Sequence, residues 1–249
     1  IDEIFELRAI DGVRALLSHC VKNAHPLRAG EGGEALPREL AAHVEKYFER
    51  SEAEMGDIPA ATLQRGQALF ARVGPEILLI LATYSLPAAY AARNGVQVLA
   101  QTDRLGSDTN RRLFETTQMV IDVLRPGGLD RADRPESHGV GIRTAQKVRL
   151  MHAAVRRMIL HHREGFAEAY GVPINQEDLL GTLMTFSWIV LDGLDRMGIV
   201  TSPEEREAYL ETWLHVGRIL GIEDRGLPRT VEEARALTDL FHARQIAPS

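Results

Sequence analysis

The chain is poor in the residues that build several common sites and structures. It has one cysteine in 249 residues, Cys20, which excludes an internal disulfide and a metal site made of several cysteines. Aromatic residues make up only 6%, and the alternating apolar pattern of β-strands is almost absent. The most apolar run, 179–191, is shorter than the roughly 20 residues of a membrane-spanning helix. We therefore expect no transmembrane segment.

A basic excess is also lacking. The formal net charge is −6, which argues against a nucleic-acid surface, because such surfaces are usually basic. Residues 1–22 have neither the basic start nor the uninterrupted apolar run of a signal peptide. This favours a cytoplasmic location, although the chain begins at Ile1 rather than at methionine, which leaves the compartment open.

Several enzyme motifs are missing as well. The sequence has no His-Glu-x-x-His pattern, which disfavours zincin-type hydrolases. It has no Glu-x-x-His pair of the kind that di-iron helix bundles use. Phosphate-binding glycine loops and the Gly-x-Ser-x-Gly elbow are also absent, so any chemistry must come from another arrangement.

Apolar residues recur instead at helical spacing, which predicts an all-α fold. The polar loop 126–141 could be a linker, but its flanking helices are strongly apolar, so residues 1–249 are expected to form one domain. Asn175, Ser202 and Thr230 are expected N-caps, since an acidic residue follows each by three positions. The expected helices are 2–21, 37–53, 59–73, 76–92, 96–104, 108–124, 141–163, 176–196, 203–220 and 231–245.

The expected helix 141–163 carries the most informative pattern. Arg149, His152 and Arg156 are spaced i, i+3 and i+7, so they share one helix face with apolar neighbours. A neutral imidazole can bind a metal ion, and arginines can bind planar carboxylates through paired N–H groups. Haem would satisfy both needs, through its iron and its propionates. The alternative is a core histidine, with both arginines paired to Glu115, Asp178, Asp192 or other helix carboxylates.

A second polar face lies in the segment 110–124. Arg112, Glu115 and Thr116 fall at i, i+3 and i+4, whereas Phe114 is expected to face the core. These polar residues either pair with one another on a partly solvated face or lie across a cofactor from the histidine.

The helix 176–196 is expected to be a buried central helix. Its Thr182 and Thr185 would then be buried hydroxyl groups. Each either bonds a carbonyl of the preceding turn or faces a bound polar group. With helix 108–124, this helix is expected to line an apolar ligand pocket.

The chain resembles the oxygenase family of the rubber oxygenases (latex clearing proteins) and of the fungal mpaB protein, in three segments: VRLMHAAVRRMI, YGVPINQEDLLGTLMTFSWIVLDGL and SPEEREAYLETWLHVGRILGI. The resemblance extends over residues 75–245. It implies an all-helical domain that encloses a b-type haem. It also implies dioxygen chemistry, typically the oxidative cleavage of an isoprenoid double bond.

The resemblance also implies roles for individual residues. His152 is similar to the axial ligand of the haem iron. The residues that it places around the haem are the flanking Arg149 and Arg156, the distal-side Arg112 and Thr116, and a pocket threonine that is either Thr182 or Thr185.

Two positions depart from the rubber oxygenases. Glu115 stands where they have a lysine that can occupy the open iron position. Residues 81–102, where they carry a glutamate proposed as a base, contain no acidic residue. Glu115 could transfer protons if burial raised its pKa. These departures favour a related oxidation or a different substrate over polyisoprene cleavage by that mechanism.

The leading hypothesis is therefore a haem b-dependent oxygenase that acts with dioxygen on a hydrophobic small-molecule or polyprenyl substrate. The alternative is a helical protein without catalytic activity that binds haem or an apolar ligand as a sensor or carrier. A third hypothesis is a helical interaction module without a cofactor, in which internal carboxylates hold the arginines.

Overall fold

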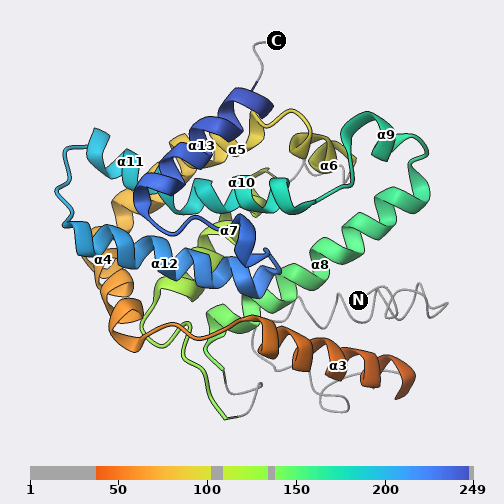
Figure 1. The fold of residues 1–249 in the computed structure, drawn as a ribbon, viewed down its shortest axis with the longest axis horizontal. Coiled ribbons are helices and arrows are strands. Elements are labelled where there is room, and N and C mark those ends of the chain that lie inside the picture. Colours follow the sequence, from red (N-terminus) through yellow and green to blue (C-terminus); the bar gives the residue numbers. More distant parts are fainter. Residues whose placement is uncertain (1–37, 102–108, 134–137, 247–249) are drawn as a thin grey trace.

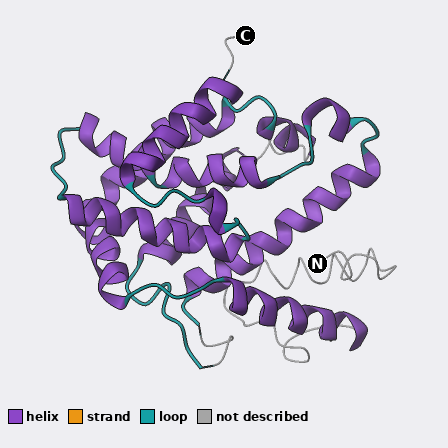
Figure 2. Cartoon of the chain, viewed as in Figure 1, coloured by secondary structure: helices purple, strands orange, loops and turns teal. Residues whose placement is uncertain are grey.

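The structure is a computed structural model that describes residues 38–101, 109–133 and 138–246. Within these ranges the regular elements are helices and no strand occurs, which confirms the predicted all-α class (Figures 1 and 2). The longer helices are α3 (Arg38–Glu54), α4 (Ala60–Ile80), α7 (Thr109–Leu124), α8 (Val140–His162), α10 (Gln176–Phe186), α11 (Trp188–Arg196), α12 (Pro203–Leu220) and α13 (Val231–Gln245). The shorter elements are η1 (Leu81–Ser85), α5 (Leu86–Tyr90), α6 (Gly95–Gln101), α9 (Phe166–Tyr170) and η3 (Asp224–Gly226). The expected helix 2–21 and Cys20 lie outside the described residues.

Helix α12 lies in the middle of the fold, and α3, α4, α8, α10 and α13 all pack against it (Figure 1). Its approach to α4 is close because Gly66 has no side chain. A Cβ atom at this position would lie 2.4 Å from Thr212 Oγ1 and 3.0 Å from the Ala208 carbonyl oxygen. The main hydrophobic core therefore forms around α12, with Tyr209 and Trp213 among its largest buried side chains.

The main core also takes residues from both sides of the polar loop 126–141. Leu124 of α7 and Ile142 of α8 are fully buried in it, and the two helices pack against each other. The expectation that the helices flanking this loop share a core is confirmed.

The first long apolar segment differs from the prediction. Two helices were expected at 59–73 and 76–92, whereas the chain continues as α4 with a kink at Val73 (φ −133°, ψ 32°). The kink accommodates Pro75, which has no N–H and would clash with the preceding turn of a straight helix. A π-helical turn follows at Leu81–Ser85, in which the Leu86 N–H donates to the Leu81 carbonyl just before Pro87.

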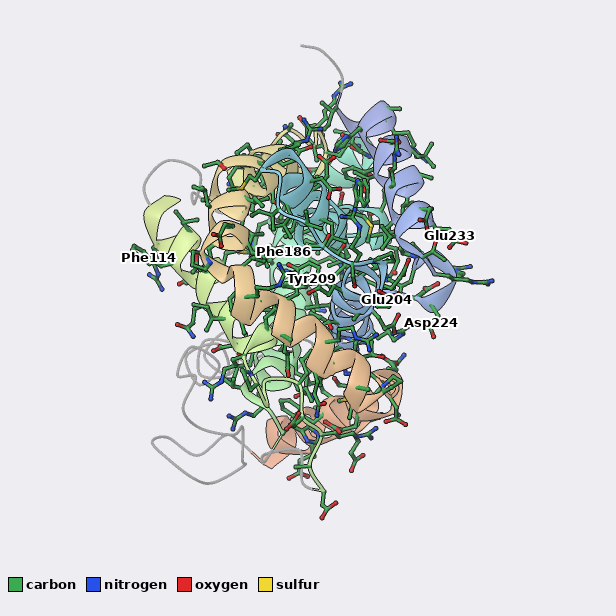
Figure 3. The ribbon with its side chains drawn as sticks, turned by 90° about the vertical axis from the view of Figure 1, so that its left-hand side faces the viewer. Phe114, Phe186, Glu204, Tyr209, Asp224 and Glu233 are labelled. Atoms are coloured by element: carbon green, nitrogen blue, oxygen red, sulfur yellow. The ribbon has the colours of Figure 1, made fainter. Side chains whose placement is uncertain are left out.

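The expected helix 176–196 is divided in two. Ser187 adopts φ −104° and ψ −83° between α10 and α11, and its hydroxyl donates to the Leu183 carbonyl. The Tyr209 hydroxyl of α12 donates to the Phe186 carbonyl at 3.1 Å, so a side chain satisfies the backbone group that the break leaves free. Figure 3 shows Phe186 and Tyr209 close together inside the fold.

The expected N-caps are confirmed. The side chains of Asn175, Ser202 and Thr230 each accept the N–H of the residue three positions later. For Asn175 and Ser202, the acidic side chain also accepts the N–H of the cap residue, which completes a capping box. The short helix α9 was not predicted from the sequence.

One helical stretch, Ala60–Tyr90, is long and apolar enough to cross a membrane. In the structure, 39% of its most apolar window is buried against other parts of the protein. Core helices of soluble proteins also meet this criterion, so length and composition alone do not identify a membrane span. The most apolar run identified from the sequence was a different segment, 179–191. In the structure this segment is divided between α10 and α11 and is mostly buried.

Candidate functional site

Helix α8 is held by two separate groups of apolar side chains. Its N-terminal half contributes Ile142 and Ala145 to the main core. Farther along, Ile159 packs with Val98 of α6 and Phe166 of α9 in a second, smaller core. Figure 1 shows α8 running from beneath α12 out to α9. The predicted arginine–histidine stripe lies between these two anchoring points.

His152 is half-buried, and its Nδ1 atom is inaccessible to solvent with no hydrogen-bond partner. Burial lowers the pKa of its imidazole to about 4, and the positive charge of Arg156 contributes to this shift. The ring is therefore neutral at pH 7, which is the form that can bind a metal ion.

Arg149 is engaged by groups of this chain. Its Nη2 lies 2.6 Å from Glu54 Oε2 of α3, and its Nη1 donates to the Ile219 carbonyl at 3.4 Å. The guanidinium lies against Gly221, where a Cβ would be 2.9 Å from Arg149 Cζ. Gly221 is the left-handed residue (φ +89°) that ends α12. Arg149 thus joins α8 to α3 and to the end of α12.

Arg156 is also engaged, but by backbone groups. Its Nε donates to the Pro173 carbonyl at 2.9 Å, and its Nη2 donates to the Ile174 carbonyl. Both acceptors lie in the turn that precedes α10. The carboxylate that pairs with Arg149 is Glu54, one of the other helix carboxylates that the alternative allowed. Burial raises the pKa of Asp178, which the sequence had named as an arginine partner, and the positive charge of Arg156 opposes this shift.

The α7 residues are placed less centrally than the sequence suggested. Glu115 has 52% of its side chain exposed and pairs with Arg111 at 2.8 Å, so it lacks the burial on which its proton-transfer role was conditioned. Thr116 is half-buried. The side chain of Arg112 lies outside the described part of the structure. Phe114 was wrongly expected in the core: it is 74% exposed and lies at the edge of the molecule (Figure 3).

The two α10 threonines differ from each other. Thr185 is buried, as predicted, and its hydroxyl donates to the Thr182 carbonyl at 2.7 Å. This is the local bond that competes with a ligand for such a group. Thr182 is exposed, which corrects the expectation of a second buried hydroxyl. The buried residues of α10 are Leu179, Gly181, Leu183, Met184 and Thr185, so position 182 lies at the edge of the buried face although it is only one turn from Thr185.

A cavity of about 280 Å³ lies beside α10, but not on the expected side. Its lining includes Leu180, Gly181 and Met184 of α10 with Leu237 and Phe241 of α13. No described residue of α7 lines it, and neither threonine does. This cavity is therefore not the pocket between α7 and α10 that the sequence predicted.

The sequence allowed a helix carboxylate as an arginine partner but did not identify Glu54 or the two carbonyls that Arg156 binds. Glu54 lies 95 residues before Arg149, and nothing in the spacing connects the two. The carbonyls of Pro173 and Ile174 belong to the segment GVPINQED, which was recognised as a motif and an N-cap but not as an acceptor for Arg156.

Over the residues that the structure describes, the fold and this stripe define a helical protein with a half-buried, neutral histidine between two internally held arginines. The chain belongs to the family described as "ER-bound oxygenase mpaB/B'/Rubber oxygenase, catalytic domain", which matches residues 37–249. This confirms the family resemblance and extends it toward the N-terminus, beyond the expected start at residue 75.

Two known proteins show the relationship in more detail. The rubber oxygenase of Streptomyces sp. (strain K30) is 27% identical over 232 residues, which cover 91% of this chain and 52% of the relative. The chain thus spans about half the length of the curated relative it matches. The structure of the latex clearing protein LCP in the closed state superimposes with a TM-score of 0.73 at 23% identity, over 99% of this chain and 62% of that one. The second comparison supports the fold.

Proposed function

We propose that this chain is a haem b-dependent oxygenase that acts with dioxygen on a hydrophobic substrate of isoprenoid type. Family membership supports the class of activity. The observation that best supports the cofactor is the position of His152, a neutral and half-buried imidazole that lies on one helix face with Arg149 and Arg156.

The residues present fit such a cofactor through the histidine first. His152 would hold the iron, and bound haem would supply the redox centre for dioxygen chemistry. Arg149 and Arg156 would place positive charge on either side of the imidazole. Arg156 also keeps the ring unprotonated, because a cation nearby disfavours the imidazolium.

Helices α7 and α10 would supply the other polar groups of the site. Arg112 and Thr116 of α7 would present N–H and O–H donors toward developing negative charge. On α10, Thr185 holds its hydroxyl on the Thr182 carbonyl, which fixes its orientation. Glu115, exposed and paired with Arg111, would adjust charge at the edge of the site.

The proposed substrate class rests on the relatives and on Glu115, a position at which this chain differs from the rubber oxygenases. One relative is named a rubber oxygenase, so polyisoprene or a shorter prenyl chain is the proposed substrate type. Glu115 stands where rubber oxygenases carry a lysine, and an acidic side chain cannot act as an amine ligand. We therefore favour a prenyl-bearing small molecule over a long polymer.

The cofactor is tested by expressing the chain with an adequate haem supply and recording its absorption spectrum. The wild type should be coloured, and His152→Ala should lose the haem band. His161→Ala, which changes an exposed histidine on the same helix, should keep it. A colourless wild type with full-length, folded protein would contradict the proposal.

A second function, a haem-binding sensor or carrier without catalysis, is favoured by Glu115 alone. The two functions separate when the reduced, haem-loaded protein is given dioxygen with polyisoprene and with prenylated small molecules. Carbonyl products identify the oxygenase. A stable haem spectrum without product from any of these substrates identifies the sensor or carrier.

A further inference from the structure

The turn before α10 contains an unusual backbone conformation. Ile174 has φ +53° and is the one non-glycine residue with a positive φ in the part of the chain that the structure describes. The left-handed region is disfavoured for side chains branched at Cβ, because Cβ crowds the backbone. Such a residue persists only where its surroundings hold it.

Arg156 holds this turn from both sides of the strained residue. The φ and ψ angles of Ile174 set the relative orientation of the two peptide units that flank its Cα. The carbonyl of the first unit belongs to Pro173 and that of the second to Ile174 itself. One guanidinium donates to both, from Nε and from Nη2. A planar fork that binds both peptide units therefore restrains the left-handed conformation directly.

The side chain of Ile174 explains why glycine does not occupy this position. It is partly buried and packs against both the main core and the small core of α6, α8 and α9. The strained turn thus places an apolar side chain at the junction of the two cores. Glycine would adopt the conformation easily but would leave this junction unfilled.

The same turn fixes where α10 begins. Asn175 and Asp178 form the capping box that starts the helix, with bonds of 3.0 and 3.1 Å. The Gln176 side chain donates to the Gly221 carbonyl at 2.9 Å and accepts the Glu223 N–H at 3.0 Å. The segment 173–178 therefore connects α8, through Arg156, with α10 and with the end of α12.

We propose that Arg156 is a positioning residue: by holding the peptide units around Ile174, it fixes the start of α10 against α8, one helical turn from His152. Its main acceptor is then the protein backbone rather than a carboxylate of the cofactor. The consequence for haem binding rests on the proposed function. The restraint on the turn does not, because it is a property of the protein chain itself.

The first test measures the restraint without reference to the cofactor. Arg156→Met should lower the thermal unfolding midpoint by roughly 5 °C and speed amide hydrogen exchange in residues 175–180. Arg156→Lys keeps the positive charge but not the planar fork, so it should speed exchange at 175–180 to a smaller degree. If Arg156→Met fails to fold, Arg156→Lys takes its place. Arg157→Met is the matched control, because Arg157 is an exposed arginine on the same helix and its loss should leave exchange at 175–180 unchanged.

The second test asks whether relieving the strain replaces the arginine. In Arg156→Met, changing Ile174 to Gly or to Asn, both of which tolerate positive φ, should recover part of the slow exchange at 175–180, because the strain is relieved although the apolar contact of Ile174 is lost. In the haem-loaded protein, Arg156→Met should weaken haem affinity about tenfold, and the Ile174 change should recover part of it. In the control Arg157→Met there should be no loss for the same Ile174 changes to recover.

Two outcomes would overturn the proposal. One is unchanged exchange at 175–180 in both Arg156 variants. The other is a loss of haem affinity in Arg156→Met that neither Ile174 change recovers, since that result identifies a direct contact with the cofactor. If no variant, including the wild type, binds haem while exchange responds as expected, the proposed function fails and the positioning role of Arg156 stands.

Discussion

Arg149 on α8 and Glu54 on α3 are joined at 2.6 Å, across 95 residues of sequence. The other Glu54 oxygen accepts from Arg50 at 2.6 Å. Burial raises the pKa of Glu54, but the hydrogen bonds and charges of Arg50 and Arg149 outweigh this and lower it overall. A carboxylate that remains ionised therefore ties the first described helix to the helix that carries the candidate site.

Replacing Glu54 by Gln should lower the free energy of unfolding by about 1 kcal/mol at pH 7, because a charge-assisted bond becomes a neutral one. Glu54 is ionised more readily in the folded state, so its contribution is present above the ordinary glutamate pKa and is lost as the pH falls through the folded value. Urea unfolding of the wild type and of Glu54→Gln at pH 7 and pH 3 measures the loss of stability and its dependence on pH. Exposed Glu49 on the same helix is the control, and an equal loss in Glu49→Gln would contradict this account.

His215 should make stability depend on pH between about 4 and 6.5. It is 3% exposed, and burial, with the charge of Arg218, lowers its pKa to about 4 from the model-compound value of 6.5. The unfolded state then binds the extra proton in this range, so the free energy of unfolding rises with pH. The full effect is on the order of 3 kcal/mol.

Unfolding of His215→Gln across this pH range should show a shallower slope than the wild type, by about one proton. His161→Gln, which alters an exposed histidine, should keep the wild-type slope. Equal slopes in all three proteins would show that His215 does not titrate as its burial requires.

Tyr209→Phe should lower the free energy of unfolding by about 1–2 kcal/mol. The hydroxyl donates to the Phe186 carbonyl at the break between α10 and α11, and its removal leaves that acceptor unpaired inside the protein. The ring itself is retained, so packing hardly changes. Chemical denaturation measures the loss, and faster amide exchange at residues 187–190 would locate it at the break.

Gly66→Ala should destabilise the protein although alanine is the better helix former. The new Cβ would lie 2.4 Å from Thr212 Oγ1, and this overlap outweighs the roughly 1 kcal/mol of helix propensity that alanine adds. Gly74→Ala in the same helix is the control, since its nearest neighbour is the Phe70 ring at an ordinary 3.5 Å. Thr212→Ala should recover part of the loss in Gly66→Ala but none in Gly74→Ala.

Much of the fold could be predicted because the residues that start a helix and set its buried face lie close together in the sequence. The caps at Asn175, Ser202 and Thr230 act within a few residues, so the sequence shows them directly. The kink at Val73 and the break at Ser187 were not predicted. Both depend on how neighbouring helices receive the freed backbone groups, as Tyr209 does for Phe186.

The candidate site was recognised only in outline. The spacing of Arg149, His152 and Arg156 placed them on one face, because helix geometry is the same in any protein. Phe114 shows the limit of such reasoning: helical spacing assigned it to the core, but its side chain is 74% exposed.

Local patterns in the amino-acid order were thus enough to establish the helical class, the N-caps at Asn175, Ser202 and Thr230, and the common face of the arginine–histidine stripe. Three-dimensional packing alone decided which groups the guanidiniums meet, namely Glu54 and Ile219 for Arg149, and the carbonyls around Ile174 for Arg156. The reason is range: a helical turn involves neighbours within four residues, whereas these partners are brought together only after distant helices bury a shared core.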